Sequence, residues 1–409
     1  MQADVTLEEF EVEAAAFLQA NAKPKVEARF EWGVGSDRVA LFADKSPEED
    51  RAELAAARQW AEQVYDAGFG WVSGPPDYGG RGLGREFARA WQTLQAGYDT
   101  PPLGVFSVGL GMVAPTVLAH GTDEQKAHYL PALYRGDLVG CQLFSEPGAG
   151  SDLASLTTRA VRDGDEWVVN GQKVWTSYAH LADVGEIICR TDPDLEKHQG
   201  LTAFLIDMHQ PGVEVRPLRQ MTGGASFNEV FFTDAHIPDR LRLGGVSEGW
   251  GVALTTLMNE RAAIGATGGG GGGTSTTRLI ELVRHLGKDQ DPLVRQRLAE
   301  VIINSKVAGY TNLRAMARIA AGGVPGPEMS ISKLALTANM VRICELASTV
   351  LGPELVANSG RWGTYAWTEL LLGVPAMRIA GGSDEVLRNI LGERVLGLPK
   401  EPKPAGATG

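Results

Sequence analysis

The stretch CQLFSEPGAGSD, residues 141–152, lies where the periodicity of the chain changes. Before it, apolar residues recur at helical intervals, whereas after it short β-prone runs alternate with Gly, Pro and Asp. Its own glycines and small residues allow a backbone to approach a neighbouring group closely. We therefore expect a turn at the entrance to a β-domain, with helices on the N-terminal side.

The residues before this stretch predict helices with clear ends. Thr6 and Glu9 have the spacing of a capping box, which marks a helix N-terminus. A second helical run over residues 47–67 stops at Gly68. Residues 69–82 contain Gly74-Pro75-Pro76 and Gly79-Gly80, so they are expected to form turns.

The residues after it predict strands. Asp163-Gly164 and Asn170-Gly171 flank a β-prone run and are typical of tight hairpin turns. Further strands are expected at residues 187–188, 203–206, 213–215 and 230–232. Together these predict an antiparallel β-domain.

Helical periodicity returns from Trp250, and one long helix is expected from Glu328 to Leu351, ended by Gly352-Pro353. The predicted fold class is α+β: an N-terminal helical domain at residues 1–138, a β-barrel-like domain at 139–242, a helical bundle at 243–398 and a flexible tail at 399–409. Six consecutive glycines, residues 268–273, follow no strand, so they do not predict a dinucleotide fingerprint. They indicate either a flexible interruption between helices or a close approach of backbone to a ligand.

Composition argues against several classes of protein. A net charge of −12 over 409 residues disfavours a nucleic-acid partner. Three cysteines without C-x-x-C spacing and seven histidines without an H-x-x-x-H pair predict neither a disulfide scaffold nor a bound metal. The acidic N-terminus does not predict a signal peptide, and no uninterrupted apolar run predicts a membrane span. We expect a cytoplasmic enzyme without membrane insertion.

Residues 141–152 resemble the flavin-binding signature of the acyl-CoA dehydrogenase family. Other segments resemble that family in the same order along the chain, namely GTDEQK at 121–126, KVWTS at 173–177, DAHIP at 234–238 and RNILGER at 388–394. Residues 325–328, PGPE, resemble the actinobacterial branch that acts on sterol or branched acyl chains. The resemblance implies FAD as cofactor and an acyl-CoA thioester as substrate.

The resemblance also implies a set of site residues. Those expected at the cofactor are Gln142, Phe144, Ser145, Gly150, Ser151, Trp175, Thr176, Ser177, Ser383 and Glu385. Those expected at the substrate are Ser151, Arg261 and Gly381. No metal ligand is among them.

Making an α,β double bond requires a base for the α-proton, and a carboxylate in a dry pocket suits that task. In the commoner family arrangement, a glutamate stands just before the glycine of a late loop, but here Gly381 takes its place. The second arrangement has the base on the first helix after the β-domain, directly before an arginine. Glu260 and Arg261 match it. Glu260 is therefore the expected base, and Glu385 is the next candidate.

Two departures concern the FAD pyrophosphate. Residues 284–289 read RHLGKD, without the family's Arg-x-x-Phe-Gly motif, and Thr349 and Pro353 replace a usual Gln and Gly. The expected function is FAD-dependent dehydrogenation of a bulky or branched acyl-CoA, in lipid β-oxidation, with an electron-transferring flavoprotein as acceptor. A homo-oligomer (dimer or tetramer) or a mixed tetramer with a paralogous subunit is expected. The alternatives are a partner subunit without activity of its own, and a flavin oxidase or monooxygenase on the same fold.

Overall fold

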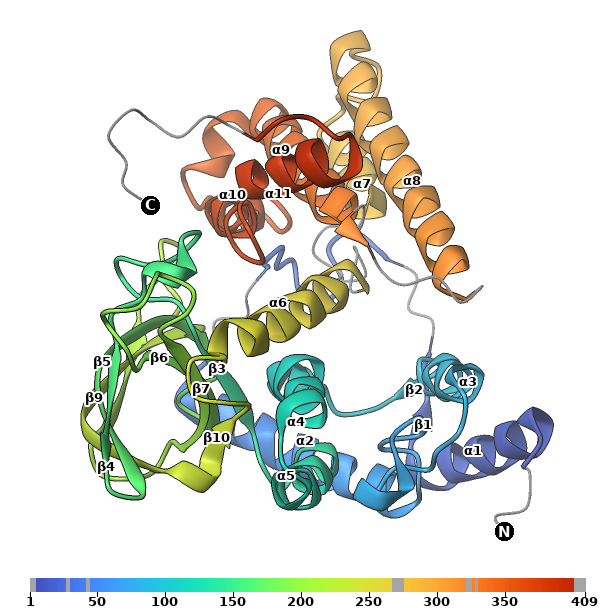
Figure 1. The fold of residues 1–409 in the computed structure, drawn as a ribbon. Helices are drawn as coiled ribbons and strands as arrows, with labels where there is room; N and C mark the ends of the chain where they lie inside the picture. The colour runs from blue at the N-terminus through green and yellow to red at the C-terminus, as the bar shows by residue number, and fades with distance from the viewer. Residues whose placement is uncertain are drawn as a thin grey trace. The chain divides into compact units, whose positions relative to one another are not determined.

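The computed structural model describes residues 5–26, 30–41, 45–266, 276–320, 326–327 and 330–400. The chain divides into two compact units (Figure 1). The first unit comprises Met1–Ala28 and Asp44–Asn259, and the second comprises Arg29–Ala43 and Glu260–Gly409. An early segment thus packs with the C-terminal helices, which the local sequence pattern did not predict. Hydrogen bonds help to hold this early segment against the C-terminal helices. Arg278, on one of these helices, donates to the backbone oxygens of Ser36 and Arg38, both at 2.7 Å.

The N-terminal helices begin and end where the sequence predicts. Helix α1, Leu7–Asn21, starts with the capping box of Thr6 and Glu9. Helix α2, Pro47–Asp66, starts with a second capping box at Ser46, and Gly68 follows it with a φ of 81°. The remaining helices here are α3, Arg85–Gln95, a π-helical turn at Gly109–Val113, α4, Ala114–His120, and α5, Asp123–Arg135. Two short antiparallel strands, β1 (Lys23–Pro24) and β2 (Tyr98–Asp99), connect the segment after α1 with the segment after α3.

The β-domain is an eight-stranded sheet that curves round on itself in Figure 1. Its strands are β3 (Gly140–Leu143), β4 (Arg159–Asp163), β5 (Glu166–Ser177), β6 (Val184–Arg190), β7 (Leu201–Asp207), β8 (Val213–Leu218), β9 (Phe227–Pro238) and β10 (Arg242–Leu243). The order is β10-β7-β6-β4-β5-β9-β8, and β3 pairs with β6. The β3–β6 pair is parallel, as is one contact between β4 and β6, so the sheet is mixed rather than antiparallel as predicted. Hairpins produce only antiparallel neighbours, whereas β3 enters from the helices and reaches β6 across two intervening strands of sequence.

One of the two predicted hairpin turns is confirmed. Gly164 lies in the turn between β4 and β5, with a φ of 59°. The prediction for Asn170-Gly171 is wrong, because these residues lie inside β5 at a register shift. The side chain of Asn170 exchanges two hydrogen bonds of 3.0 Å with Asp234 on β9, and this contact holds the irregularity in place. The same residue types that favour turns also favour bulges.

Both faces of the central strands are buried. One face, with Ile187 and Phe204, forms the interior of the curved sheet. The other face, with Ile188 and Leu205, packs against α4 and the first part of α6. Strands buried on both faces are expected to be continuously apolar. Two polar side chains interrupt this pattern, Thr202 on β7 and the ionisable Glu186 on β6, and both are completely buried.

The second unit is helical. After α6, Gly249–Ala266, come α7, Thr276–His285, α8, Pro292–Ala320, α9, Ser330–Leu351, α10, Ala366–Met377, and α11, Asp384–Ile390. Helix α9 confirms the predicted long helix and ends at Gly352, which has a φ of 55°. Glu328, the glycines at 268–273 and residues 401–409 of the tail lie outside the described residues.

Helix α9 is the main core element of the second unit. Within the described part of the chain, Ser330–Leu355 is the one helix long and apolar enough to cross a membrane, with a mean hydropathy of 1.3. Half of that window is buried inside the protein, and Leu346, Ala347 and Val350 belong to the core of the unit. A buried core helix meets the same criterion of length and composition.

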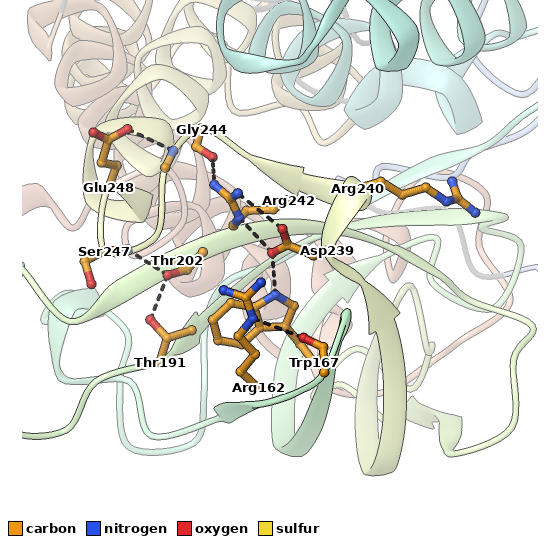
Figure 2. Close-up of polar contacts among 12 residues, drawn as sticks. Arg162, Trp167, Thr191, Thr202, Asp239, Arg240, Arg242, Gly244, Ser247 and Glu248 are labelled. Carbon is orange, nitrogen blue, oxygen red and sulfur yellow. Dashed lines mark hydrogen bonds and ion pairs between the residues drawn. The ribbon is translucent and has the colours of Figure 1, made fainter.

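The chain is tied to the sheet just before α6 begins (Figure 2). Asp239 accepts hydrogen bonds from Trp167 Nε1 at 2.8 Å and Arg242 Nε at 3.1 Å. The bonds from Arg242 and then Trp167 lower the pKa of Asp239. Further along, the backbone N–H of Ser247 donates to Thr202 Oγ1 at 3.0 Å. These contacts set where α6 leaves the β-domain.

Candidate functional site

The predicted flavin-binding stretch forms a tight loop at the end of β3. Glu146 and Ala149 are joined by two backbone hydrogen bonds of 3.0 and 3.1 Å. The backbone N–H of Val174, on β5, donates to the carbonyl of Ser145 at 2.8 Å. No atom lies within 4 Å of where a Cβ on Gly150 would stand, so the rim of the loop faces open space. The loop is therefore anchored on one side and accessible on the other.

A buried ion pair provides the anchor. Lys173 Nζ donates to Glu146 Oε1 at 2.9 Å and to the carbonyl of Phe144 at 3.0 Å, and the lysine side chain is completely buried. Glu146 also accepts from the backbone and hydroxyl of Thr157 and from the backbone of Thr158. Burial alone would raise the pKa of Glu146, but the charge of Lys173 and these hydrogen bonds outweigh it and lower the pKa to about 2. The carboxylate is thus charged and fully hydrogen-bonded, as a buried charge must be.

Trp175 has an unusual conformation for a strand residue. It has a φ of 64°, in the left-handed region, and lies where β5 shifts register against β9. Such a backbone costs about 1–2 kcal/mol for a residue other than glycine. Its side chain is 58% exposed, although its ring contacts Phe227 edge-on at 6.1 Å. A strained residue that presents a large aromatic surface is a candidate for binding a flat ligand.

The next residue, Thr176, has a buried hydroxyl without a partner. Its side chain is 2% exposed, and among the described residues no group hydrogen-bonds its Oγ1. Leaving a buried hydroxyl unpaired costs about 1–3 kcal/mol. Asn228 on β9 is the register partner of Thr176. The Nδ2 of Asn228 donates to the carbonyl of Thr176 at 3.1 Å, whereas its Oδ1 has no partner among the described residues. Sequence reasoning missed Asn228, whose position is apparent only from the strand register.

These features fit a flavin. A flavin has a flat ring system and a hydrogen-bonding edge, and the site offers an exposed indole, an unpaired hydroxyl and a loop of small residues. The structure places all eight predicted cofactor residues of the first unit on β3, on this loop and at the end of β5: Gln142, Phe144, Ser145, Gly150, Ser151, Trp175, Thr176 and Ser177. Phe144 and Thr176 are buried, whereas Gly150, Ser151 and Trp175 are exposed.

The late loop of the second unit is held by a separate buried network. Asp384 is 3% exposed and binds Lys333 and Thr337 through Oδ1, at 3.2 and 2.9 Å, and Arg378 through Oδ2 at 2.9 Å. Burial would raise the pKa of Asp384, but the bonds from Arg378, Thr337 and Lys333 lower it. Lys333 also donates to the carbonyl of Gly382 at 2.9 Å. The network fixes the loop that contains Gly381, whose φ is 65°.

The other predicted residues of this part of the chain lie on helices or at a helix end. Ser383 caps α11 by accepting from the backbone of Val386 at 3.2 Å. Glu385 is exposed in the first turn of α11 and lies 3.5 Å from Arg388. Glu260 is half-buried on α6, and the side chain of Arg261 lies outside the described residues. The cofactor residues of the β-domain and these residues belong to different units, so their convergence on one site stays a prediction.

Comparison with known proteins assigns the class. Residues 35–137, 141–235 and 247–396 match the N-terminal, middle and C-terminal domains of the acyl-CoA dehydrogenases. The chain is 39% identical over 373 residues to acyl-CoA dehydrogenase IpdE1 of Mycobacterium tuberculosis, covering 89% of this chain and 94% of that protein. The fold and site therefore define an FAD-dependent oxidoreductase.

Two solved structures share the whole fold. The Tcur3481–Tcur3483 steroid ACAD has a TM-score of 0.72 and 26% identity, over 97% of this chain and 98% of that one. The ChsE4–ChsE5 complex from Mycobacterium tuberculosis has a TM-score of 0.69 and 27% identity, over 98% and 100%. The chain belongs to the acyl-CoA dehydrogenase family, and its similarity to the Mycobacterium tuberculosis proteins supports an actinobacterial type. This confirms the resemblance found in the sequence, the α+β fold and FAD as cofactor.

Proposed function

We propose that this enzyme dehydrogenates the α,β bond of a bulky or branched acyl-CoA, such as one with a sterol side chain, and that Glu260 is the catalytic base. The proposal rests on where the candidate carboxylates Glu260, Asp384 and Glu385 lie in the second unit. Gly381 stands where the commoner family base would be, and the late loop offers only Asp384 and Glu385 nearby. Glu260 is half-buried on α6 and directly precedes Arg261.

The two loop carboxylates are poor candidates for the base. Both oxygens of Asp384 are hydrogen-bonded, and its lowered pKa makes it a weak proton acceptor. Glu385 is exposed and paired with Arg388, whereas removal of a weakly acidic α-proton calls for a carboxylate in dry surroundings. Glu260 remains as the carboxylate for which the sequence gives a catalytic position.

The proposed cofactor residues have different roles in binding and orienting the flavin. Thr176 Oγ1 would donate to the polar edge of the flavin, and Trp175 would cover one side of its ring system. FAD, when bound, supplies the acceptor for the hydrogen and two electrons that leave the β-carbon. Glu260 takes the α-proton, and the backbone N–H of Gly381 would donate to the thioester oxygen, a role that needs no side chain.

The substrate and the partners are inferred from the base position and from relatives. The name of one solved relative identifies it as a steroid ACAD, and two are complexes of two different proteins. This supports a bulky acyl group and a mixed tetramer with a paralogous subunit, with a homo-oligomer as the alternative. An electron-transferring flavoprotein is the proposed acceptor, and a cytoplasmic location is proposed with it.

A second candidate function has one observation in its favour. The missing Arg-x-x-Phe-Gly motif at residues 284–289 is what a partner subunit without its own activity would allow. The purified chain would then be colourless and inactive until mixed with its paralogue. A flavin oxidase or monooxygenase is the third candidate, and turnover that needs oxygen but no acceptor protein would identify it.

The experiment is an absorption spectrum of the purified enzyme followed by anaerobic titration with straight, branched and steroidal acyl-CoAs. We expect a yellow protein that a branched or steroidal thioester bleaches. Glu260→Gln should keep the flavin spectrum and lose at least about 100-fold in the rate of bleaching. Glu281→Gln, on α7 and paired with Arg284, is the matched control and should bleach as the parent does. An active Glu260→Gln enzyme with an inactive Glu385→Gln enzyme would move the base to Glu385.

A further inference from the structure

Glu186 is a carboxylic acid in the middle of an apolar layer. It lies on β6 between Val184 and Ile188, which face the same side of the sheet and belong to the cluster packed against α4 and α6. Its relative exposure is 0%. Its register partners are Gln142 on β3 and Leu205 on β7, so neither neighbouring strand supplies a positive charge directly opposite.

The polar contacts of Glu186 come from two threonines on the helices. Thr256 Oγ1, on α6, lies 2.6 Å from Glu186 Oε1, and Thr116 Oγ1, on α4, lies 2.9 Å from Thr256 Oγ1. Within the described structure, Glu186 Oε2 has no hydrogen-bond partner. One strand and two helices therefore meet at a short chain of three side chains in the first unit.

The three side chains can share their hydrogens in either form of Glu186, so the bare oxygen Oε2 decides between the two forms. A protonated Glu186 can donate to Thr256, Thr256 can then donate to Thr116, and Thr116 can donate to the carbonyl of Met112 at 2.8 Å. Every hydrogen then has an acceptor. An ionised Glu186 would instead hold one oxygen of a carboxylate bare in an apolar layer, which is far more costly than a bare neutral oxygen.

The charge surroundings agree with the neutral form. Burial raises the pKa of Glu186 to about 8, against a smaller lowering by the hydrogen bond from Thr256, and no charged group of the described residues contributes. Among the described side chains, the titratable groups on the elements packed here are His120 on α4, Cys141 on β3, Asp207 on β7 and Glu260 on α6. His120 bonds Thr255 at 2.8 Å rather than Glu186.

We propose that Glu186, in its protonated form, is a positioning residue for Glu260, acting through Thr256. Thr256 and Glu260 are four residues apart on α6 and therefore lie on the same face of the helix, one turn apart. The start of α6 is held by Ser247 and Thr202 (Figure 2), and the Glu186 contact holds the helix two turns further on. The inference rests on the proposed role of Glu260, but the protonation of Glu186 can be tested without it.

The first test compares thermal unfolding of the holoenzyme and its Glu186→Gln variant between pH 4.5 and 9. The variant is neutral at every pH. Because the parent's carboxyl binds its proton more tightly folded than unfolded, its stabilising effect is complete below about pH 4.5 and is lost as the pH rises to about 8. The Tm of the parent should therefore fall relative to that of the variant across this window. Parallel curves would overturn the proposal.

The second test measures the rate of flavin reduction by acyl-CoA in stopped flow. Thr256→Val should retain FAD and acyl-CoA affinity but reduce flavin up to about 100-fold more slowly, since a small displacement of a reacting group has that effect. Thr255→Val, whose hydroxyl contacts His120 and not Glu186, is the matched control and should react as the parent does. An unchanged rate in Thr256→Val would overturn the positioning role.

The pH profile links the two tests. The parent's reduction rate should decline above about pH 8, and Glu186→Gln should keep the neutral-pH rate without that decline. Identical alkaline limbs would count against the proposal. If no acyl-CoA reduces the parent's flavin at all, the proposed function fails and the positioning role fails with it. The unfolding comparison would still report the protonation state of Glu186.

Discussion

Lys173 Nζ lies 2.9 Å from Glu146 Oε1, and both side chains are buried. The two residues come from segments that are separate in sequence, the loop at residues 141–152 and the strand β5. Their ion pair joins the two parts of the candidate flavin site. Its value lies in fixing the loop against the strand, because a buried pair adds little net stability over an apolar substitute.

Removing the cation of this pair should destabilise the enzyme strongly. Lys173→Met leaves Glu146 buried without its counter-charge, which typically costs about 3–5 kcal/mol. Urea unfolding of the holoenzyme measures the loss. Lys197→Met is the control, because Lys197 pairs with Asp152 at the surface and should contribute less than about 1 kcal/mol. Equal losses in both variants would contradict the structural role of Lys173.

Acid should weaken the same pair. Folding lowers the pKa of Glu146 from 4.5 to about 2, so the folded protein binds this proton more weakly than the unfolded chain does. Its contribution is complete above about pH 4.5 and is lost as the pH falls toward 2, which amounts to about 3 kcal/mol. Urea unfolding at pH 5, 4 and 3 measures this acid limb, and Lys173→Met should have a shallower one. An equally steep limb in the variant would argue against the assignment.

The unpaired hydroxyl of Thr176 should matter for FAD and not for folding. Thr176→Val keeps the shape and removes a group that has no partner among the described residues, so the free energy of unfolding of the apoprotein should stay level or rise. FAD affinity should fall by about 2–10-fold, the value of one hydrogen bond. Titration of the apoprotein by flavin fluorescence measures it.

Thr202→Val is the matched control for Thr176→Val. The hydroxyl of Thr202 accepts from Ser247 and contacts Thr191 at 2.7 Å, so its loss should destabilise the fold by about 1 kcal/mol and leave FAD affinity unchanged. The reverse pattern in the two variants would remove Thr176 from the cofactor site.

Asp384 should be structural, and its neighbour Glu385 should not. Asp384→Asn removes the buried charge that faces Lys333 and Arg378, and the expected loss is about 3 kcal/mol in urea unfolding. Glu385→Gln, at an exposed site, should stay within about 0.5 kcal/mol of the parent. A mild Asp384→Asn variant would mean that the loop near Gly381 does not depend on this network.

Local signals in the sequence predicted most of the fold. The capping box at Thr6, the turn at Gly164 and the end of α9 at Gly352 each depend on residues within one turn of one another, so the sequence contains all the interacting groups. The turn predicted at Asn170 failed because Asp234, a residue distant in sequence, supplies its hydrogen bonds. The parallel pairing of β3 with β6 was missed for the same reason.

The sequence by itself determined the family, the cofactor and the order of the motifs, because these are carried by residue identities along the chain. Only the tertiary structure decided which polar groups are satisfied. The unpaired hydroxyl of Thr176, the paired charge of Glu146 and the isolated acid of Glu186 depend on partners that come from other strands and helices. Inside the protein, the presence or absence of a partner changes the free energy of unfolding strongly. Burial is a property of the packed chain rather than of any one segment of it.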